Sequence, residues 1–224
     1  AAMMIALIGG RVTPSFTRNW LVARKVASLP AAASRLDLAV LVVTGIAVAA
    51  WVIAPTSEIA GGALVFAGAG NVLRLSRWRG EKTFAEPLVW ILHNGYGWLG
   101  LALALMGAAA LWPARVPYSA GIHALTVGAI GVMTLAMMTR AILGHTGRAR
   151  TAGKGTLAIY LFANLAAWLR FAAAFAPAQQ AVLLGLSAAA WSLAFGGFVI
   201  LYGPMLIGPR ADLPSPKTSS QSAV

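Results

Sequence analysis

The sequence has no cysteine and very little acidic charge, and each absence excludes a class of protein. Without cysteine the chain can form no disulfide, no thiolate metal site and no iron–sulfur cluster. Aspartate and glutamate together number 5, against 17 lysines and arginines, so the formal net charge is +12. None of these acids stands in the middle of a long apolar run. A carrier that couples transport to protons or sodium through buried carboxylates is therefore disfavoured.

Hydrophobic residues are what the chain has in abundance. They make up 59% of the sequence, and charged residues only 10%, whereas soluble domains carry about 25%. The apolar residues form blocks of roughly 20, the length that crosses about 30 Å of hydrocarbon as a helix. The predicted fold class is all-α, a polytopic transmembrane helix bundle. Because the basic residues lie in the connections between blocks, the expected partner is the lipid bilayer and not nucleic acid.

The blocks divide the chain into a bundle with flanking segments. Residues 1–9 are apolar without a charged leader, so we interpret them as the remnant of a preceding transmembrane helix. Residues 10–35 form a basic cytoplasmic segment, residues 36–206 a six-helix transmembrane bundle, and residues 207–224 a polar cytoplasmic tail that is expected to be flexible. The six predicted spans are 36–54, 59–74, 88–112, 119–143, 156–175 and 179–206.

The distribution of lysine and arginine predicts the orientation of the bundle. Residues 10–35, 74–86 and 144–154 and the tail hold nearly all the basic residues of the connections, whereas the intervening turns hold Arg115 alone. Positively charged connections favour the cytoplasm. We therefore expect the basic connections and the C-terminus on the cytoplasmic side.

His93 and Tyr96 are polar residues at membrane depth in the third span. Ionisable groups in hydrocarbon are costly, which makes His93 a candidate ligand and Tyr96 a candidate hydrogen-bonding partner of the same group. The alternative is an interior histidine with satisfied hydrogen bonds beside a packed tyrosine. Helical spacing continues their face through small residues, which would let a flat group or another helix approach: Gly97, Gly100, Ala104 and Gly107.

His123 and Arg170 are predicted at similar depth near the outer surface. His123 lies about one turn into the fourth span and Arg170 about one and a half turns from the end of the fifth. A neutral imidazole can bind haem iron, copper or zinc, and arginine can clamp a carboxylate. His123 as an axial ligand with Arg170 on a haem propionate is therefore coherent. The alternative is that Arg170 snorkels to the interface and His123 meets headgroups.

Further polar and soft side chains are open to two interpretations. Arg140 and His145 stand at the cytoplasmic end of the fourth span, where a histidine is more often an interfacial loop residue. Three methionines at helical spacing in that span could serve Cu(I) or could simply pack: Met133, Met137 and Met138. Three asparagines could line a cavity or bond between helices: Asn71, Asn94 and Asn164.

Several of these residues fall within motifs that resemble one protein family. The runs are GGRVTPSFTRN at 9–19, LHNGYGW at 92–98, HALTVGAIG at 123–131, MMTRA at 137–141 and LGHTGR at 143–148. They resemble the NnrS family, polytopic membrane proteins of the bacterial inner membrane that are associated with the response to nitric oxide. The similarity extends to about residue 206 and corresponds to the C-terminal half of such proteins.

The resemblance implies cofactors, partners and an activity. Family members are described as containing haem and copper, so we expect haem, of the b type, with copper as a second candidate. His93, His123 and His145 are the candidate metal ligands, and Tyr96, Arg140 and Arg170 are further candidate cofactor contacts. The family's N-terminal half, or other membrane subunits, are candidate partners. Any catalysis would be that of an oxidoreductase acting on nitric oxide, with catalytic residues unassigned.

Two other functions compete with this one. A shortened chain could be a non-catalytic membrane subunit that packs within a larger complex. It could also be a channel or carrier for a small solute, although buried carboxylates and paired broken helices are not evident in the sequence.

Overall fold

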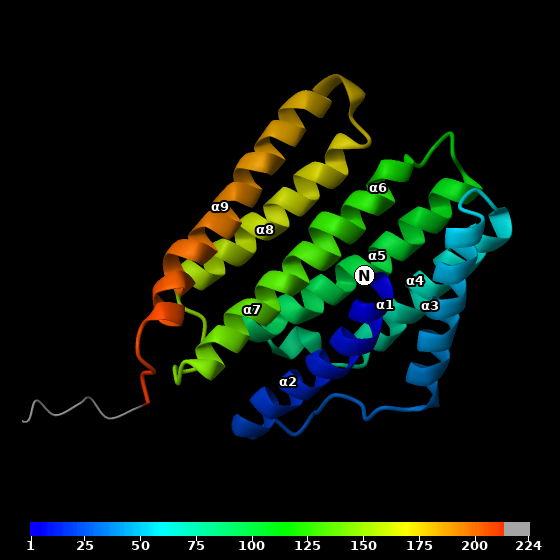
Figure 1. Ribbon diagram of the computed structural model, residues 1–224. Coiled ribbons are helices and arrows are strands. Elements are labelled where there is room, and N and C mark those ends of the chain that lie inside the picture. Colours follow the sequence, from blue (N-terminus) through cyan, green and yellow to red (C-terminus); the bar gives the residue numbers. More distant parts are fainter. Residues whose placement is uncertain (213–224) are drawn as a thin grey trace, which may run out of the picture.

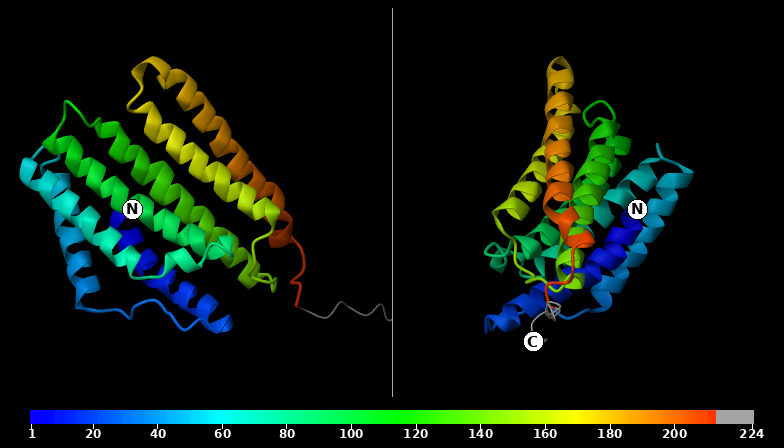
Figure 2. Two further views of the ribbon diagram at one scale, coloured as in Figure 1. Left: turned by 180° about the vertical axis from the view of Figure 1, so that it is seen from behind. Right: turned by 60° about the vertical axis from the view of Figure 1, so that its left-hand side comes forward.

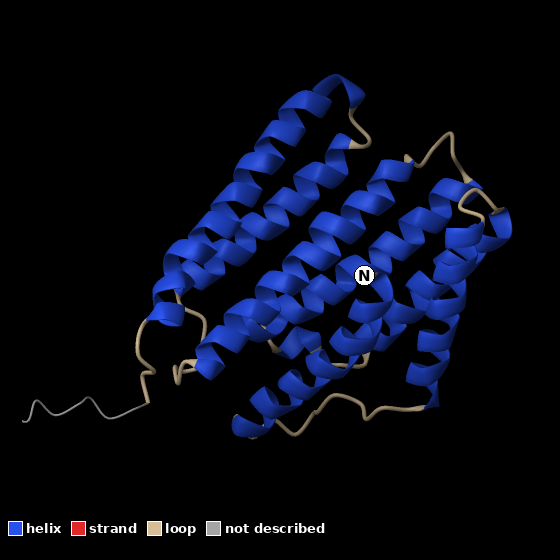
Figure 3. Ribbon diagram, in the orientation of Figure 1, coloured by secondary structure: helices blue, strands red, loops and turns tan. Residues whose placement is uncertain are grey.

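A computed structural model describes residues 1–212, and this part of the chain contains helices and loops but no strand (Figures 1 and 3). The helical elements in chain order are α1 (Ala2–Met4), the π-helical η1 (Ile5–Gly9), α2 (Gly10–Ala23), α3 (Arg35–Ile53), α4 (Glu58–Ser76), the short 3₁₀-helix η2 (Gly80–Lys82), α5 (Pro87–Leu111), α6 (Tyr118–His123), the π-helical η3 (Ala124–Gly131), α7 (Val132–His145), α8 (Lys154–Ala173), the 3₁₀-helix η4 (Pro177–Gln179) and α9 (Gln180–Ile207).

The predicted transmembrane bundle is confirmed. Within the described residues, 6 helical stretches are long and apolar enough to cross a membrane: Arg35–Ile53, Glu58–Ser76, Pro87–Leu111, Tyr118–His145, Lys154–Ala173 and Pro177–Ile207. The fourth comprises α6, η3 and α7 in one continuous rod. The chain is thus a multi-pass membrane protein whose environment is a lipid bilayer.

The helices stand side by side in chain order, from α3 at one edge to α9 at the other, with α5 in the middle (Figures 1 and 2). Burial follows this arrangement. In the apolar window of α5, 67% of residues are buried, against 17% in α3 and 22% in the last span. A helix that is apolar on all sides belongs either in a core or against lipid. The row therefore places α5 in the core and exposes α3 and α9 to lipid.

The connections gather at two ends of the bundle. We call the end that contains the connections 24–34, 77–86 and 146–153 and residues 208–212 the basic end, because these segments are rich in arginine and lysine. The turns 54–57, 112–117 and 174–176 lie at the opposite end. In Figure 1 the basic end is at the bottom. The side of the membrane that each end faces remains a prediction.

Residues 2–23 form a single helical rod, which includes most of the predicted helix remnant and the first part of the predicted basic segment. Helix runs from Ala2 to Ala23 through η1, with Pro14 inside it. It starts about halfway along the bundle and reaches the basic end, crossing α5 (Figure 1). The predicted boundary at residue 9 therefore does not interrupt the backbone. The remaining division of the chain stays a prediction, and residues 213–224 of the predicted tail lie outside the described residues.

Small residues bring α4 and α5 into close contact. A Cβ atom added at Gly68 would lie 2.7 Å from the carbonyl oxygen of Gly100 and 2.8 Å from the backbone nitrogen of Ala104. Glycine at these positions lets the two backbones approach. The small face predicted on the third span is thus covered by another helix, α4.

Two glycines of η3 have a different role, because tryptophan rings from neighbouring helices pack directly against them. A Cβ at Gly128 would lie 2.6 Å from a ring carbon of Trp98 in α5, and one at Gly131 would lie 2.6 Å from the ring of Trp191 in α9. Trp98 is also fixed by a hydrogen bond from its Nε1 to Asn164 Oδ1 in α8, at 3.2 Å. The fourth span is therefore packed from both sides at the level of its π-helical segment.

Candidate functional site

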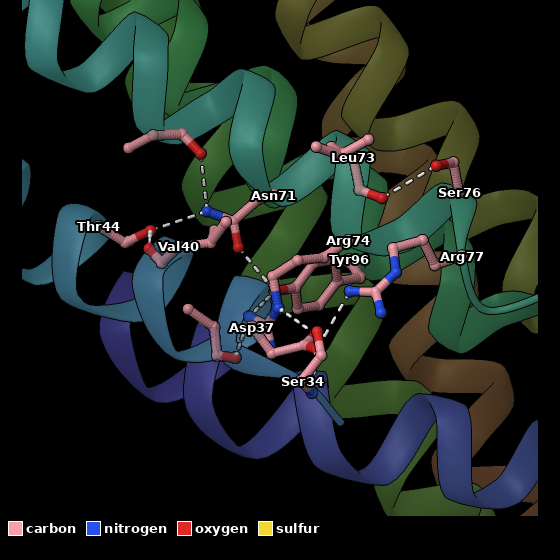
Figure 4. A network of polar contacts seen from close by, with 12 residues as sticks. Ser34, Asp37, Val40, Thr44, Asn71, Leu73, Arg74, Ser76, Arg77 and Tyr96 are labelled. Carbon is pink, nitrogen blue, oxygen red and sulfur yellow. Dashed lines mark hydrogen bonds and ion pairs between the residues drawn. The ribbon is translucent and has the colours of Figure 1, made fainter. Parts of the chain in front are cut away.

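Arg74 is the centre of a buried polar network near the basic end (Figure 4). Its side chain is only 2% exposed. Nε donates to Asp37 Oδ1 at 3.1 Å, and Nη1 donates both to the Ala6 carbonyl oxygen at 3.2 Å and to the Tyr96 hydroxyl at 2.7 Å. A buried guanidinium is tolerated when it is paired and hydrogen-bonded in this way. One side chain thereby links η1, α3, α4 and α5.

The network continues toward the membrane interior through neutral groups. The Tyr96 hydroxyl donates to Asn71 Oδ1 at 2.6 Å, and Asn71 Nδ2 donates to Thr44 Oγ1 at 2.9 Å. Thr44 in turn donates to the Val40 carbonyl oxygen at 2.7 Å. Thr44 lies nine residues into α3, which corresponds to a depth of roughly 13 Å. These hydrogen bonds satisfy polar groups that would otherwise be stranded in the bundle.

Asp37 is positioned for this role by the start of α3. Ser34 precedes the helix, and its backbone N–H donates to Asp37 Oδ2 at 2.8 Å. Arg77 adds a second ion pair to the same carboxylate at 3.2 Å. A cavity of about 830 Å³ borders the network at the basic end, and its lining includes Arg11, Arg18, Asp37 and Arg74.

His93 has polar partners different from those of Tyr96, although both belong to α5. His93 Nε2 is 2.7 Å from Thr17 Oγ1 in α2, and Thr17 donates to the Thr13 carbonyl oxygen at 2.8 Å. The histidine is 8% exposed, and Nδ1 has no partner among the described residues. A Cβ at Gly80 would lie 2.7 Å from Nδ1. The ring is thus enclosed, and a metal at Nε2 would have to displace Thr17.

His123 and Arg170 belong to two neighbouring helices, near the end of the bundle opposite the basic end. His123 is the last residue of α6, Arg170 is in the last turn of α8, and these two helices pack against each other. The charge of Arg170 acts on the His123 ring. Arg170 Nε is buried without an acceptor in residues 1–212. His123 is half-buried and directly precedes the π-helical segment η3, a type of irregularity that is frequent at functional sites.

Arg140 and His145 share a third location, at the basic end of α7. Together with five other residues they line a pocket of about 340 Å³: Phe16, Met137, Ala141, Gly144 and Arg150. The predicted methionines line a separate, apolar pocket of about 370 Å³ between η1 and α7, where Met4 joins Met133, Met137 and Met138. Across the described part of the chain, no group of three or more histidine, cysteine or acidic side chains is arranged to hold a metal ion.

The sequence-predicted residues are therefore distributed over four places. His93 lies with Thr17. Tyr96 belongs to the Arg74 network, His123 lies with Arg170, and Arg140 lies with His145. Arg74 and Asp37 were not predicted as site residues. The available signal was that Asn71 and Arg74 stand three residues apart, on one face of the second span.

Comparison with known proteins places the chain in a family. No curated protein and no solved structure matches it. The sequence model of one family, described as NnrS protein, matches residues 1–210. This match covers the whole bundle, including His93, His123, His145 and the Arg74 network, so the chain belongs to the NnrS protein family.

Proposed function

We propose that the chain is a haem-binding membrane protein of the bacterial nitric oxide response, located in the inner membrane. Membership of the NnrS family supports a role in that response, and six spans support a membrane location. The haem assignment depends on one arrangement: His123 and Arg170 belong to two helices that pack against each other, α6 and α8, and Arg170 Nε is buried without an acceptor in the described residues.

The residues at this place fit haem chemically. His123 is half-buried, and a nitrogen of its ring would hold the haem iron. Arg170 has a buried donor without an acceptor, and a propionate carboxylate would provide one. When bound, haem iron supplies a site that takes nitric oxide directly. His93 fits less well, because Thr17 and Gly80 enclose its ring.

Copper, the second cofactor of the family, would find thioether donors in the methionine pocket between η1 and α7, because soft ligands suit Cu(I). We propose nitric oxide binding rather than turnover. Reduction to nitrous oxide would join two molecules of nitric oxide and would consume two electrons and two protons.

A visible spectrum tests the proposal. The full chain would be produced with ample haem, purified in a mild detergent and examined by absorption and by the pyridine haemochrome assay. We expect a Soret band in the wild type and its loss or displacement in His123→Ala. Arg170→Leu should release haem faster or change its reduction potential.

His145→Ala is the matched control, because His145 is exposed at the basic end and far along the rod from His123. Its spectrum should equal that of the wild type. A wild-type protein without a Soret band would refute haem binding by this chain, and an unchanged His123→Ala spectrum would remove His123 as the ligand.

A further inference from the structure

The pocket at the basic end of α7 combines two arginines and a histidine with an apolar wall. Phe16 comes from α2, Arg140 and His145 from the last turns of α7, and Arg150 from the connection that follows. Its volume is about 340 Å³. The haem proposal uses none of these residues, so the pocket requires a separate explanation.

Arg140 is held in place without being paired. Its guanidinium carbon lies 3.8 Å above the centre of the Phe16 ring, a cation–π contact that limits the motion of the group. Nη1 is buried and has no acceptor within residues 1–212. A buried donor without an acceptor costs about 1–3 kcal/mol, and more when it is charged. An acceptor from outside the described chain would remove this cost.

Arg150 brings a second positive charge to the same place. A Cβ at Gly144 would lie 3.4 Å from Arg150 Nε, in ordinary van der Waals contact, so the guanidinium lies against α7. The charge of Arg150 acts on Arg140, and like charges at short range repel. Neither arginine forms an ion pair with a described residue. A bound anion would attract both guanidinium groups and so offset the repulsion between them.

The nearby carboxylates are already engaged. The charge of Glu86 reaches Arg140, but Glu86 Oε1 accepts the N–H groups of Leu88 at 3.2 Å and Ala152 at 3.0 Å. On the tail side, Asp212 pairs with Arg210 at 2.7 Å, and that hydrogen bond holds the pKa of the Asp212 carboxyl below its usual range. Neither acid forms an ion pair with the arginines of the pocket.

We propose that this pocket binds a phosphate group. Arginine forks match the several oxygens of a phosphate, and His145 adds a third polar side chain to the lining. Met137, Ala141 and Phe16 provide an apolar wall beside the charges. Basic pockets between helices at a membrane surface suit anionic headgroups. The phosphate of an anionic phospholipid and free phosphate share this chemistry, and the experiment separates them.

Binding would be measured on the full chain purified in a neutral detergent. One arm titrates inorganic phosphate by calorimetry. The other counts bound phosphatidylglycerol and phosphatidylcholine by native mass spectrometry. We expect one tight ligand, with phosphatidylglycerol preferred over phosphatidylcholine in the lipid arm, and we expect Arg140→Gln and Arg150→Gln each to weaken its binding at least about 10-fold, a typical loss for a charge-assisted pair.

Arg18→Gln is the matched control, because it removes the same charge from an exposed position of α2 that lines a different cavity. The affinity of Arg18→Gln for the ligand should stay within about twofold of the wild type.

Saturation by phosphatidylglycerol alone identifies a lipid site, and saturation by inorganic phosphate identifies a site for soluble phosphate. Absence of binding in both arms would overturn the proposal, as would equal losses in Arg18→Gln and Arg150→Gln. If Arg140→Gln does not fold, Arg150→Gln decides, because its side chain is exposed. Haem content plays no part in either arm, so this test is independent of the haem assignment.

Discussion

The arginines inside the bundle fall into two kinds. Arg74 is surrounded by acceptors: the Asp37 carboxylate, the Ala6 carbonyl and the Tyr96 hydroxyl. Arg140 and Arg170 each retain a buried N–H group without an acceptor in the described part of the chain. Arginine thus stabilises the helix packing at Arg74, whereas at Arg140 and Arg170 a buried N–H group lacks an acceptor among the described residues.

The difference teaches how a protein with few acids uses its arginines. The chain has 5 acidic residues for 17 basic ones, and Asp37 is shared by Arg74 and Arg77. The carboxylates near Arg140 are bound elsewhere. A guanidinium at membrane depth is expensive unless it is paired. The acceptors of Arg140 and Arg170 are therefore not found among residues 1–212, and this contrast with Arg74 can be tested.

The largest effect is expected from removing the acid of the paired site. Asp37→Asn leaves the Arg74 guanidinium buried without its counter-charge, which should lower the free energy of unfolding by about 3–5 kcal/mol. Unfolding of the purified protein in mixed detergent, followed by circular dichroism, measures the loss. Glu81→Gln is the control, because Glu81 and Arg79 form an exposed pair at 3.9 Å that should contribute little. Equal losses in both variants would contradict the prediction.

A smaller loss should follow when α4 is pushed away from α5. Gly68→Val places its side chain against the backbone of Gly100, so the helices must separate and the Arg74–Tyr96 hydrogen bond must lengthen. We expect a cost of about 3 kcal/mol, the upper end for overpacking. In the same unfolding assay Gly62→Val should behave like the wild type, because nothing lies within 4 Å of a Cβ there. A stable Gly68→Val protein would show that the two helices can separate without loss.

Removing one hydroxyl from the network should have a moderate effect. Tyr96→Phe deprives Arg74 Nη1 of an acceptor and Asn71 Oδ1 of a donor, while the ring stays in place against Trp78. The expected cost is about 1–2 kcal/mol. Tyr118→Phe, at an exposed tyrosine of the opposite end, is the control and should be neutral. No loss in Tyr96→Phe would mean that water replaces the hydroxyl.

The smallest effect is expected at the unpaired site. Arg170→Gln should change the free energy of unfolding of the haem-free protein by no more than about 0.5 kcal/mol, because no described residue accepts its Nε hydrogen. Arg74→Gln, measured alongside, should lose several kcal/mol. A large loss of unfolding free energy in Arg170→Gln would show that Arg170, like Arg74, stabilises the fold. It would also weaken the case for an acceptor from outside the described residues.

The bundle was predictable because its causes are local. Apolar runs of membrane length specify spans, and the rise per residue specifies depth, from which His123 and Arg170 are expected at similar depth. The small face of the third span was also recognised, although the sequence could not tell whether a helix or a flat group would cover it.

The partners of the buried polar groups were not predictable, because they come from distant segments. Arg74 was counted among loop charges, and its pairing needs Asp37 from another helix and Ala6 from the N-terminal rod. His93 was predicted as a polar residue at membrane depth, but its partner Thr17 belongs to the segment that was predicted as a basic cytoplasmic segment. Gly10 and Pro14 in that segment resemble helix breakers. Packing against α5 outweighs these local preferences.

The π-helical segment Ala124–Gly131 also sets the angular phase between the two halves of the fourth span. An α-helix advances about 100° per residue, so widening the turns within one rod rotates everything on one side of the widening relative to the other. His123 lies before the segment and Arg140 after it. Shortening the segment by one residue would restore the regular pitch and turn His123 away from α8, while Arg140 kept its orientation toward α2. The eight residues of η3 therefore set the rotation of α6 relative to α7 about their common axis. This rotation determines which neighbouring helices the side chains of α6 and α7 can face.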